Sequence, residues 1–159
     1  MSPAPQLRIP ATYMRGGTSK GVFFRLEDLP EACRAPGRAR DRLFQRVIGS
    51  PDPYGKQPDG MGGADFVDWA GNCGILSTAA GAFAIHAGYV DAAKIPQDGI
   101  CTVRIWQANI GKTIVAHVPI SGGQVQESGD FALDGVTFPA AEIVLEFLDP
   151  ADEGEAGGA

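Results

Sequence analysis

The longest uncharged segment of the chain predicts its central helix. No Asp, Glu, Lys or Arg occurs from Gly74 to Val90, and apolar or small residues fall on every side of a helical wheel. A helix that is apolar on all sides is typical of one that the rest of its domain encloses. We therefore expect a short central helix, beginning at Cys73, inside a β-rich shell. The segment is slightly short for a bilayer and contains His86, which favours a core helix over a membrane span.

Shorter patterns predict the other elements. Alternation of apolar and polar residues indicates strands over residues 7–14, 22–26, 101–108, 112–120, 136–138 and 143–148. Side chains along the 112–120 strand should alternate between two faces. Ile114, Ala116, Val118 and Ile120 would lie on one face, and Thr113, Val115 and His117 on the other. Residues 15–21 should form a compact loop that joins the first two strands. Residues 39–48 show the spacing of an amphipathic surface helix, and residues 50–64 that of a long loop.

Composition narrows the class of protein. A chain of 159 residues with 44% hydrophobic residues suits one globular domain, and 22 Gly and 12 Pro indicate many turns. The formal net charge of −6 argues against nucleic acid as a partner, and the arginines of residues 38–46, interrupted by Asp41, are more typical of a solvated helix face than of an anion patch. Cys33, Cys73 and Cys101 are widely spaced, which predicts neither a disulfide framework nor a metal site. No leader pattern opens the sequence, so we expect a protein of the cytoplasm without a membrane partner.

Cys73 is the candidate for chemistry. Unpaired N–H groups and the dipole at a helix start favour a thiolate and attract carboxylates. As a base that removes a proton next to a carboxylate, such a thiolate would need a conjugate acid and donors for the enolate-like charge. Those donors would be Asn72 and the Gly74 N–H, while the remaining carboxylates would be held by the loop residues Arg15, Gly17, Thr18 and Ser19 together with Asn109. From the residues alone, a buried cysteine with only a packing role remains the alternative.

Neither histidine is a clear partner for Cys73. His86 lies thirteen residues further along the same helix. At about 1.5 Å per residue this is roughly 20 Å, too far for direct activation of the thiol. His117 stays open as a partner, although a strand histidine beside apolar neighbours is more often structural.

Four stretches resemble one family of enzymes. They are 11–24 (ATYMRGGTSKGVFF), 48–54 with 59–64 (IGSPDPY and DGMGGA), 67–74 (VDWAGNCG) and 107–113 (QANIGKT). In this order they are similar to the PrpF-type 2-methylaconitate cis-trans isomerases. The resemblance implies the α+β diaminopimelate epimerase-like fold, a mixed or antiparallel barrel-like shell around a central helix. It also implies a cofactor-independent isomerase of unsaturated tricarboxylates, in the methylcitrate route of propionate breakdown, with Cys73 as the acid/base.

Two departures from that family change the expectation for this chain. Its members have a Ser/Thr-rich segment ending in a lysine, then a strand hairpin, so about thirty residues are expected to be absent near 64–66, which would leave open sheet edges. The lysine is the family's expected proton-transfer partner for the cysteine. A second, similar domain that the resemblance implies is also expected to be absent. The expected organisation is a tail over 1–6, a first epimerase-like domain over 7–148 and an acidic, disordered tail over 149–159.

Competing hypotheses follow from these departures. The leading one is a first-domain form of the isomerase, inactive or impaired by itself. The second is a non-catalytic fragment that binds carboxylates or pairs with another chain, including a second copy, through open sheet edges. An oxalomesaconate-type tautomerase is a further alternative. A redox thiol protein is disfavoured because no resolving cysteine lies near Cys73.

Overall fold

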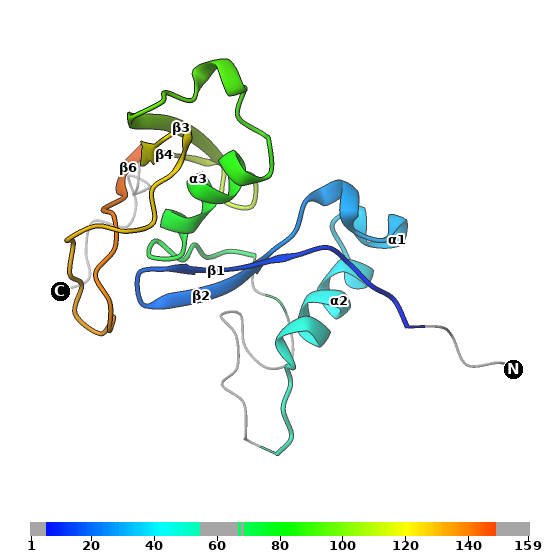
Figure 1. Cartoon of the computed structure of the whole chain (residues 1–159). Coiled ribbons are helices and arrows are strands. Elements are labelled where there is room, and N and C mark those ends of the chain that lie inside the picture. Colours follow the sequence, from blue (N-terminus) through cyan, green and yellow to red (C-terminus); the bar gives the residue numbers. More distant parts are fainter. Residues whose placement is uncertain (1–5, 55–66, 68, 149–159) are drawn as a thin grey trace, which may run out of the picture. The chain divides into compact units, whose positions relative to one another are not determined.

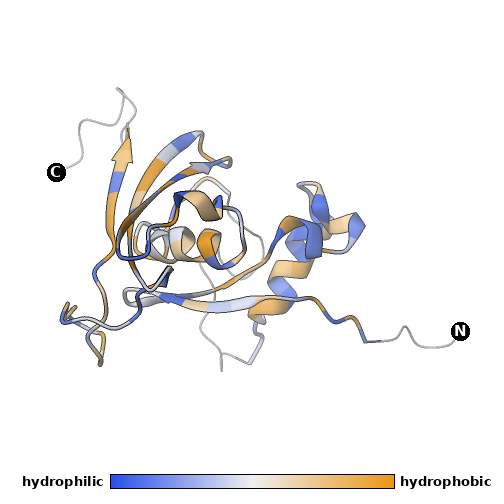
Figure 2. Cartoon of the chain, turned by 45° about the horizontal axis from the view of Figure 1, so that its top comes forward, coloured by the Kyte–Doolittle hydropathy of each residue, from blue (hydrophilic) through white to orange (hydrophobic). Residues whose placement is uncertain are grey.

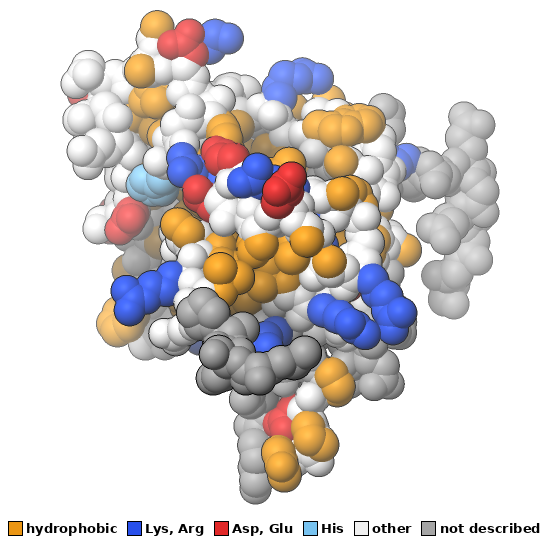
Figure 3. Space-filling view, turned by 90° about the vertical axis from the view of Figure 1, so that its right-hand side faces the viewer, with side chains coloured by type: hydrophobic (Ala, Val, Ile, Leu, Met, Phe, Trp, Pro, Cys, Tyr) orange, Lys and Arg blue, Asp and Glu red, His pale blue; other side chains and the backbone are white. Residues whose placement is uncertain are grey.

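The computed structural model describes residues 6–54, 67 and 69–148 (Figure 1). The chain divides into two compact units, one of Met1–Thr12 and Val22–Gly71, the other of Tyr13–Gly21 and Asn72–Ala159. The predicted acidic tail and residues 55–64 of the predicted long loop lie outside the described residues. Among the helices that are described, none is long and apolar enough to cross a bilayer. On the face drawn in Figure 3, Lys and Arg side chains are scattered among hydrophobic and other side chains, and some lie beside Asp or Glu.

The first unit is built on short helices and an aromatic cluster. It contains the 3-10 turn η1 (Leu26–Asp28) and the helices α1 (Glu31–Arg34) and α2 (Arg38–Ile48), of which α2 confirms the predicted surface helix. The Phe44 ring of α2 lies 5.9 Å from the Phe24 ring and 6.1 Å from the Trp69 ring, between centroids. Trp69 Nε1 donates to Asp41 at 3.0 Å, which ties the cluster back to the helix.

An ion pair stabilises the turn η1 in this unit. Arg25 donates to both carboxylate oxygens of Asp28, at 2.8 and 3.1 Å. This hydrogen-bonded guanidinium lowers the pKa of Asp28 below its ordinary value. The 3-10 turn η1 is thereby closed by side chains as well as by the backbone.

A four-stranded antiparallel sheet forms the scaffold of the second unit. Its central strand β4 (Lys112–Ser121) pairs along one edge with β3 (Gly99–Gln107) and along the other with β6 (Val144–Leu148) and β5 (Gln124–Val125). The β3–β4 register runs from Gly99↔Ile120 to Gln107↔Lys112. Residues 136–138, predicted as a strand, instead lie in an irregular segment with a bend at 137–138, between the partners of an isolated bridge, Phe131 and Ala140.

The alternation predicted for β4 is confirmed. The core-facing residues of this strand are at most 2% exposed: Ile114, Ala116, Val118 and Ile120. On the opposite face, His117 is half-buried and its imidazole makes a hydrogen bond with Glu146 of β6. Figure 2 shows apolar stretches of the sheet strands beside the helix α3 (Ser77–His86), which packs on the core side.

The central helix differs from the prediction in two respects. It begins at Ser77 rather than at Cys73, because Gly74–Leu76 form a separate turn. It is also not enclosed on every side by the described residues. Ala79, Gly81, Ala82 and Ile85 are buried, the remaining positions are half-buried and His86 is exposed. The sheet covers one side of the helix. Because side chains such as Ala and Ser are small, partial exposure of the other sides costs little free energy.

A tight hairpin replaces the predicted seven-residue loop. The strands β1 (Thr12–Gly16) and β2 (Ser19–Phe23) pair with each other and are joined by Gly17 and Thr18 alone. Gly17 has φ +53°, a left-handed conformation that suits glycine and permits a two-residue turn. Arg15 and Ser19 therefore lie on strands, and the first strand begins at Thr12 rather than at residue 7.

Gly81 sets how closely α3 approaches the sheet. A Cβ at this position would lie 2.9 Å from Ala116 Cβ and 3.0 Å from Val118 Cγ2. We expect Gly81→Ala to lower the free energy of unfolding by about 1 kcal/mol, because overpacking outweighs the gain in helix propensity. Chemical denaturation measures the change. Gly71→Ala is the control, since a Cβ there meets nothing within 4 Å. An Ala variant at 81 as stable as the unsubstituted protein would contradict this account of the packing.

Candidate functional site

Cys73 begins the turn that leads into α3. Its carbonyl oxygen accepts hydrogen bonds from the Ser77 N–H at 3.0 Å and the Ser77 hydroxyl at 2.9 Å. Its Sγ accepts the Leu76 N–H at 3.4 Å, three residues along the chain. The sulfur therefore takes the place that an oxygen of Ser or Asp takes in an N-cap.

The β1–β2 hairpin lies directly against this turn because it carries glycine where the two meet. A Cβ on Gly16 would lie 2.7 Å from Thr78 Oγ1 and 2.8 Å from the Ile75 carbonyl oxygen. A Cβ on Gly21 would lie 2.8 Å from Leu76 Cδ2. This close approach brings Ser19 Oγ to 3.6 Å from Cys73 Sγ, although the two residues are 54 positions apart in sequence.

Asn72 is held by a residue that the sequence did not single out. Its Oδ1 accepts a hydrogen bond from Nε2 of Gln107, the last residue of β3, and lies 3.2 Å from Ser77 Oγ. Gln107 belongs to the 107–113 stretch on which the family resemblance rests, but its contact with Asn72 spans 35 positions. The packing of α3 against the sheet brings that glutamine to the site.

The other predicted residues surround this group without contacting Cys73. Gly74 is half-buried, and a Cβ on it would lie 3.5 Å from Phe147 Cζ. Thr18 and Asn109 are exposed in the β1–β2 and β3–β4 turns. Arg15 is exposed on β1, and strand alternation turns it away from the face that Gly16 presents to Ile75. The structure thus brings together Ser19, Asn72, Cys73 and Gly74.

The assembled site is rich in uncharged donors. Among the described residues, neither the Gly74 N–H nor the Ile75 N–H has an acceptor. With the Asn72 amide and the Ser19 hydroxyl, they form a donor set beside a thiol. Such a set suits a carboxylate, or the charge that develops on one when a neighbouring carbon loses a proton. The described part of the chain contains no group of three or more His, Cys, Asp or Glu arranged to hold a metal ion.

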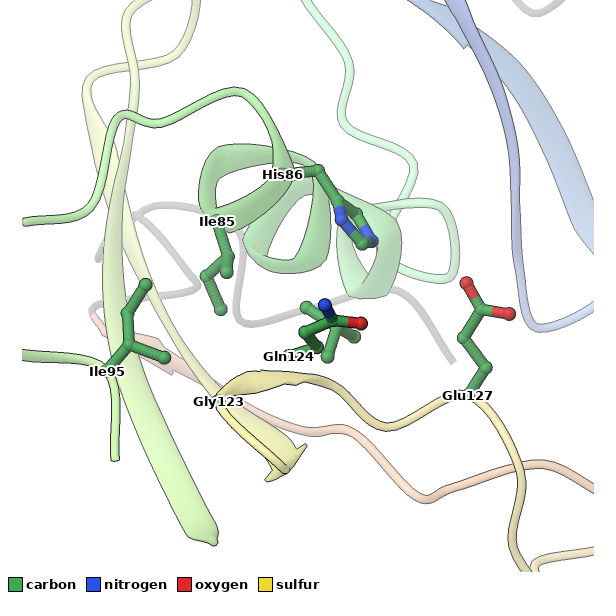
Figure 4. A pocket seen from close by; sticks show the side chains of 7 residues that line it. Ile85, His86, Ile95, Gly123, Gln124 and Glu127 are labelled. Atoms are coloured by element: carbon green, nitrogen blue, oxygen red, sulfur yellow. The ribbon is translucent and has the colours of Figure 1, made fainter. Parts of the chain in front are cut away.

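A separate hollow lies at the other end of α3. It has a volume of about 590 Å³ and is lined by Ile85, His86, Ile95, Gly123, Gln124, Val125 and Glu127. Figure 4 shows the His86, Gln124 and Glu127 side chains at this hollow, with His86 above Gln124 and Glu127 to the right of both. His86 is therefore at the opposite end of α3 from Cys73, as its position in the sequence predicts.

Comparison with known proteins places this arrangement in a family. The family model described as "PrpF protein" matches residues 6–66 and 64–159. The chain belongs to the PrpF family. The PrpF chain is 60% identical over 191 residues to "2-methyl-aconitate isomerase" from Cupriavidus necator, with 100% of this chain and 48% of the relative covered. The protein of the same name from Shewanella oneidensis is 60% identical, with 96% of this chain and 47% of the relative covered.

More distant relatives carry the names of enzymes that act on other acids. "4-Oxalomesaconate tautomerase" from Pseudomonas putida is 39% identical, over 92% of this chain and 46% of its own. The crystal structure of a methylitaconate-delta-isomerase superposes with a TM-score of 0.69 at 32% identity, covering 89% of this chain and 42% of that one. The predicted α+β, diaminopimelate epimerase-like fold is thereby confirmed. The chain spans about half the length of the curated relatives it matches.

The three cysteines should react with alkylating reagents in a fixed order. Cys73 is half-buried, whereas Cys33 and Cys101 are buried. Burial also raises the pKa of the Cys101 thiol, which lowers its thiolate fraction. We expect iodoacetamide to label Cys73 at least about tenfold faster than either other cysteine in the folded protein. Peptide mass spectrometry measures the labelling rate of each cysteine, and the difference between the three rates should disappear in protein unfolded in guanidinium. Faster labelling of Cys101 would contradict the placement of Cys73.

Proposed function

We propose that this PrpF chain carries the cysteine half of the active site of an isomerase for unsaturated tricarboxylates, with 2-methylaconitate as the preferred class of substrate. The observation that carries the proposal is the position of Cys73 Sγ, which accepts the Leu76 N–H at 3.4 Å and lies 3.6 Å from Ser19 Oγ. A thiol held in this way sits next to donors that suit a carboxylate. The names of the two 60% identical relatives support the choice of substrate.

The proposed chemistry is a proton transfer. The Cys73 thiolate takes a proton from a carbon allylic to the double bond of the substrate, and the electron pair left behind spreads into the conjugated carboxylate. Donors from Gly74, Ile75 and Asn72 stabilise that charge. A proton returned to another carbon of the same system completes the isomerisation and leaves the numbers of atoms and electrons unchanged. The step requires no cofactor, which is the expectation for this site.

The second proton-transfer group is where this chain differs from the family. The alignment with the Cupriavidus relative spans 191 residues against 159 in the chain, which leaves 191 − 159 = 32 positions without a counterpart. The family model also matches in two pieces that meet at residues 64–66. Both observations support an internal deletion there, inside a first domain over residues 7–148. The deleted segment would include the lysine that the resemblance implies, so this chain should isomerise its substrate poorly.

Gly17, Thr18, Ser19 and Asn109 complete the proposed carboxylate site, and the hydroxyl and amide side chains would hold the carboxylates that lie away from the reacting carbon. Arg15, the predicted cation, lies on the opposite face of β1 and is left out of this set. The wider setting that we propose is propionate breakdown by the methylcitrate route in the cytoplasm. Open sheet edges left by the deletion would favour pairing with a second copy.

An oxalomesaconate-type tautomerase is the second candidate. The 39% identity to the Pseudomonas protein, over 92% of the chain, favours the same kind of proton transfer on a related acid. A carboxylate-binding fragment without turnover is the outcome expected if the deletion removes all catalysis.

Exchange of substrate protons with solvent tests the role of Cys73 without requiring complete turnover. In D2O, the purified chain should exchange allylic protons of 2-methylaconitate for deuterium, because removal and return of a proton by one base suffices. Proton NMR measures the loss of signal. We expect Cys73→Ser to slow the exchange by about 100-fold or more, the usual contribution of a general base.

Cys33→Ser is the matched control, since Cys33 lies in α1 within the other unit and should leave the exchange rate unchanged. Equal exchange by the unsubstituted chain and the Cys73→Ser variant would contradict the assignment of Cys73. Complete absence of exchange in both would favour the non-catalytic fragment. Running the same comparison with oxalomesaconate distinguishes the two substrate classes.

A further inference from the structure

The side-chain amide of Asn72 has its orientation set mainly by Gln107. Asn72 Oδ1 accepts a hydrogen bond from Gln107 Nε2 and lies 3.2 Å from Ser77 Oγ. The single proton of the Ser77 hydroxyl is shared between Asn72 Oδ1, at 3.2 Å, and the Cys73 carbonyl oxygen, which is closer at 2.9 Å. Gln107 is therefore the principal donor to the Asn72 oxygen.

Fixing the oxygen also fixes the nitrogen. An asparagine amide can turn by 180° with little change in shape, so its hydrogen-bond partners decide which atom faces which way. With Oδ1 facing Gln107, the two Nδ2 protons of Asn72 face away from it. They have no acceptor among the described residues. Two donors thus remain available on the residue that precedes Cys73.

We propose that Gln107 is a positioning residue, which keeps the Asn72 amide turned so that its N–H groups, and not its oxygen, are offered to an anionic ligand beside Cys73. Gln107 acts through Asn72 and does not itself touch the ligand. The inference rests on the proposed function in that it takes Cys73 as the reacting group and a carboxylate as the ligand. It adds a residue from a different strand to the site.

The sheet makes Gln107 suitable for this role. It is the last residue of β3 and is paired in register with Lys112 of β4, so its backbone is held by the strand ladder. Its side chain is half-buried, which restricts the directions it can take. If the Asn72 amide were reversed, its oxygen would face the carboxylate and repel it.

Replacing the side-chain amide nitrogen of Gln107 by oxygen, in the variant Gln107→Glu, tests the proposal. In Gln107→Glu the new carboxylate accepts hydrogen bonds but cannot donate, so the Asn72 NH2 should turn toward it and the oxygen toward the ligand. The readout is the ratio of Cys73 alkylation rates with iodoacetate, an anion, and iodoacetamide, a neutral reagent of similar size. We expect the ratio to fall about tenfold, the effect of one hydrogen bond to a charged group. Alkylation needs no turnover, so a failed isomerase assay would not affect this result.

A double variant separates positioning from simple charge repulsion. If Gln107 acts through Asn72, Gln107→Glu should change the ratio by less than about twofold when Asn72 is already Ala. Direct repulsion of iodoacetate by the new carboxylate would persist in the Asn72→Ala background. Gln124→Glu adds the same charge at an exposed residue of β5 and should leave the ratio within about twofold of the unsubstituted protein.

The variant Gln107→Ala provides a second test that adds no charge, in case the added charge of Gln107→Glu causes misfolding. It removes the donor without adding an acceptor, so the Asn72 amide should sample both orientations and the ratio should fall by a smaller factor than in Gln107→Glu. Circular dichroism shows whether each variant is folded. An unchanged ratio in Gln107→Ala and Gln107→Glu, or an equal fall in the presence and absence of Asn72, would overturn the proposal.

Discussion

The site depends on the contact between the glycine face of the β1–β2 hairpin and the Ile75–Thr78 segment, where Gly16 meets the backbone and Gly21 meets the Leu76 side chain. Gly16 and Gly21 approach that segment more closely than any side chain would permit. Their spacing lets strand β2 present Ser19, which lies between them, to Cys73. A methyl group at Gly16 would meet backbone atoms, which cannot rotate away as the end of a side chain can. The hairpin would then have to shift, and the donor beside the sulfur would move with it.

The sheet supplies the second fixed surface. Core residues of β4 are almost fully buried under α3, and Gly81 lets the helix lie close against them. Because α3 is anchored in this way, the turn that carries Cys73 has a defined position relative to the end of β3. Gln107 at that end then reaches Asn72. Strand β2, the turn that carries Cys73 and the end of β3 are distant in sequence but meet around Asn72 and Cys73. Packing, rather than charge, holds each of these three segments.

Local patterns in the sequence were sufficient for much of this scaffold. Strict alternation predicts the buried face of β4, and helical spacing predicts α2, because both features depend on residues close in sequence. The prediction that Cys73 lies near a helix start was also close, although Gly74–Leu76 form a turn before α3 begins at Ser77. The contact of Gln107 with Asn72 could not be predicted, since it depends on how α3 packs against the sheet. The two-residue turn at Gly17 was missed because a run of Gly, Thr and Ser is equally typical of a longer loop.

Protection of Cys73 from alkylation by a bound tricarboxylate tests the central claim most directly, because it reports ligand and sulfur together. Trans-aconitate should slow iodoacetamide labelling of Cys73 in a saturable way, whereas its uncharged trimethyl ester should not. Gly16→Ala should abolish the protection, and Gly71→Ala, where a Cβ meets nothing within 4 Å, should retain it. Equal protection by the acid and the ester, or full protection in Gly16→Ala, would contradict an anion site held together by the hairpin contact.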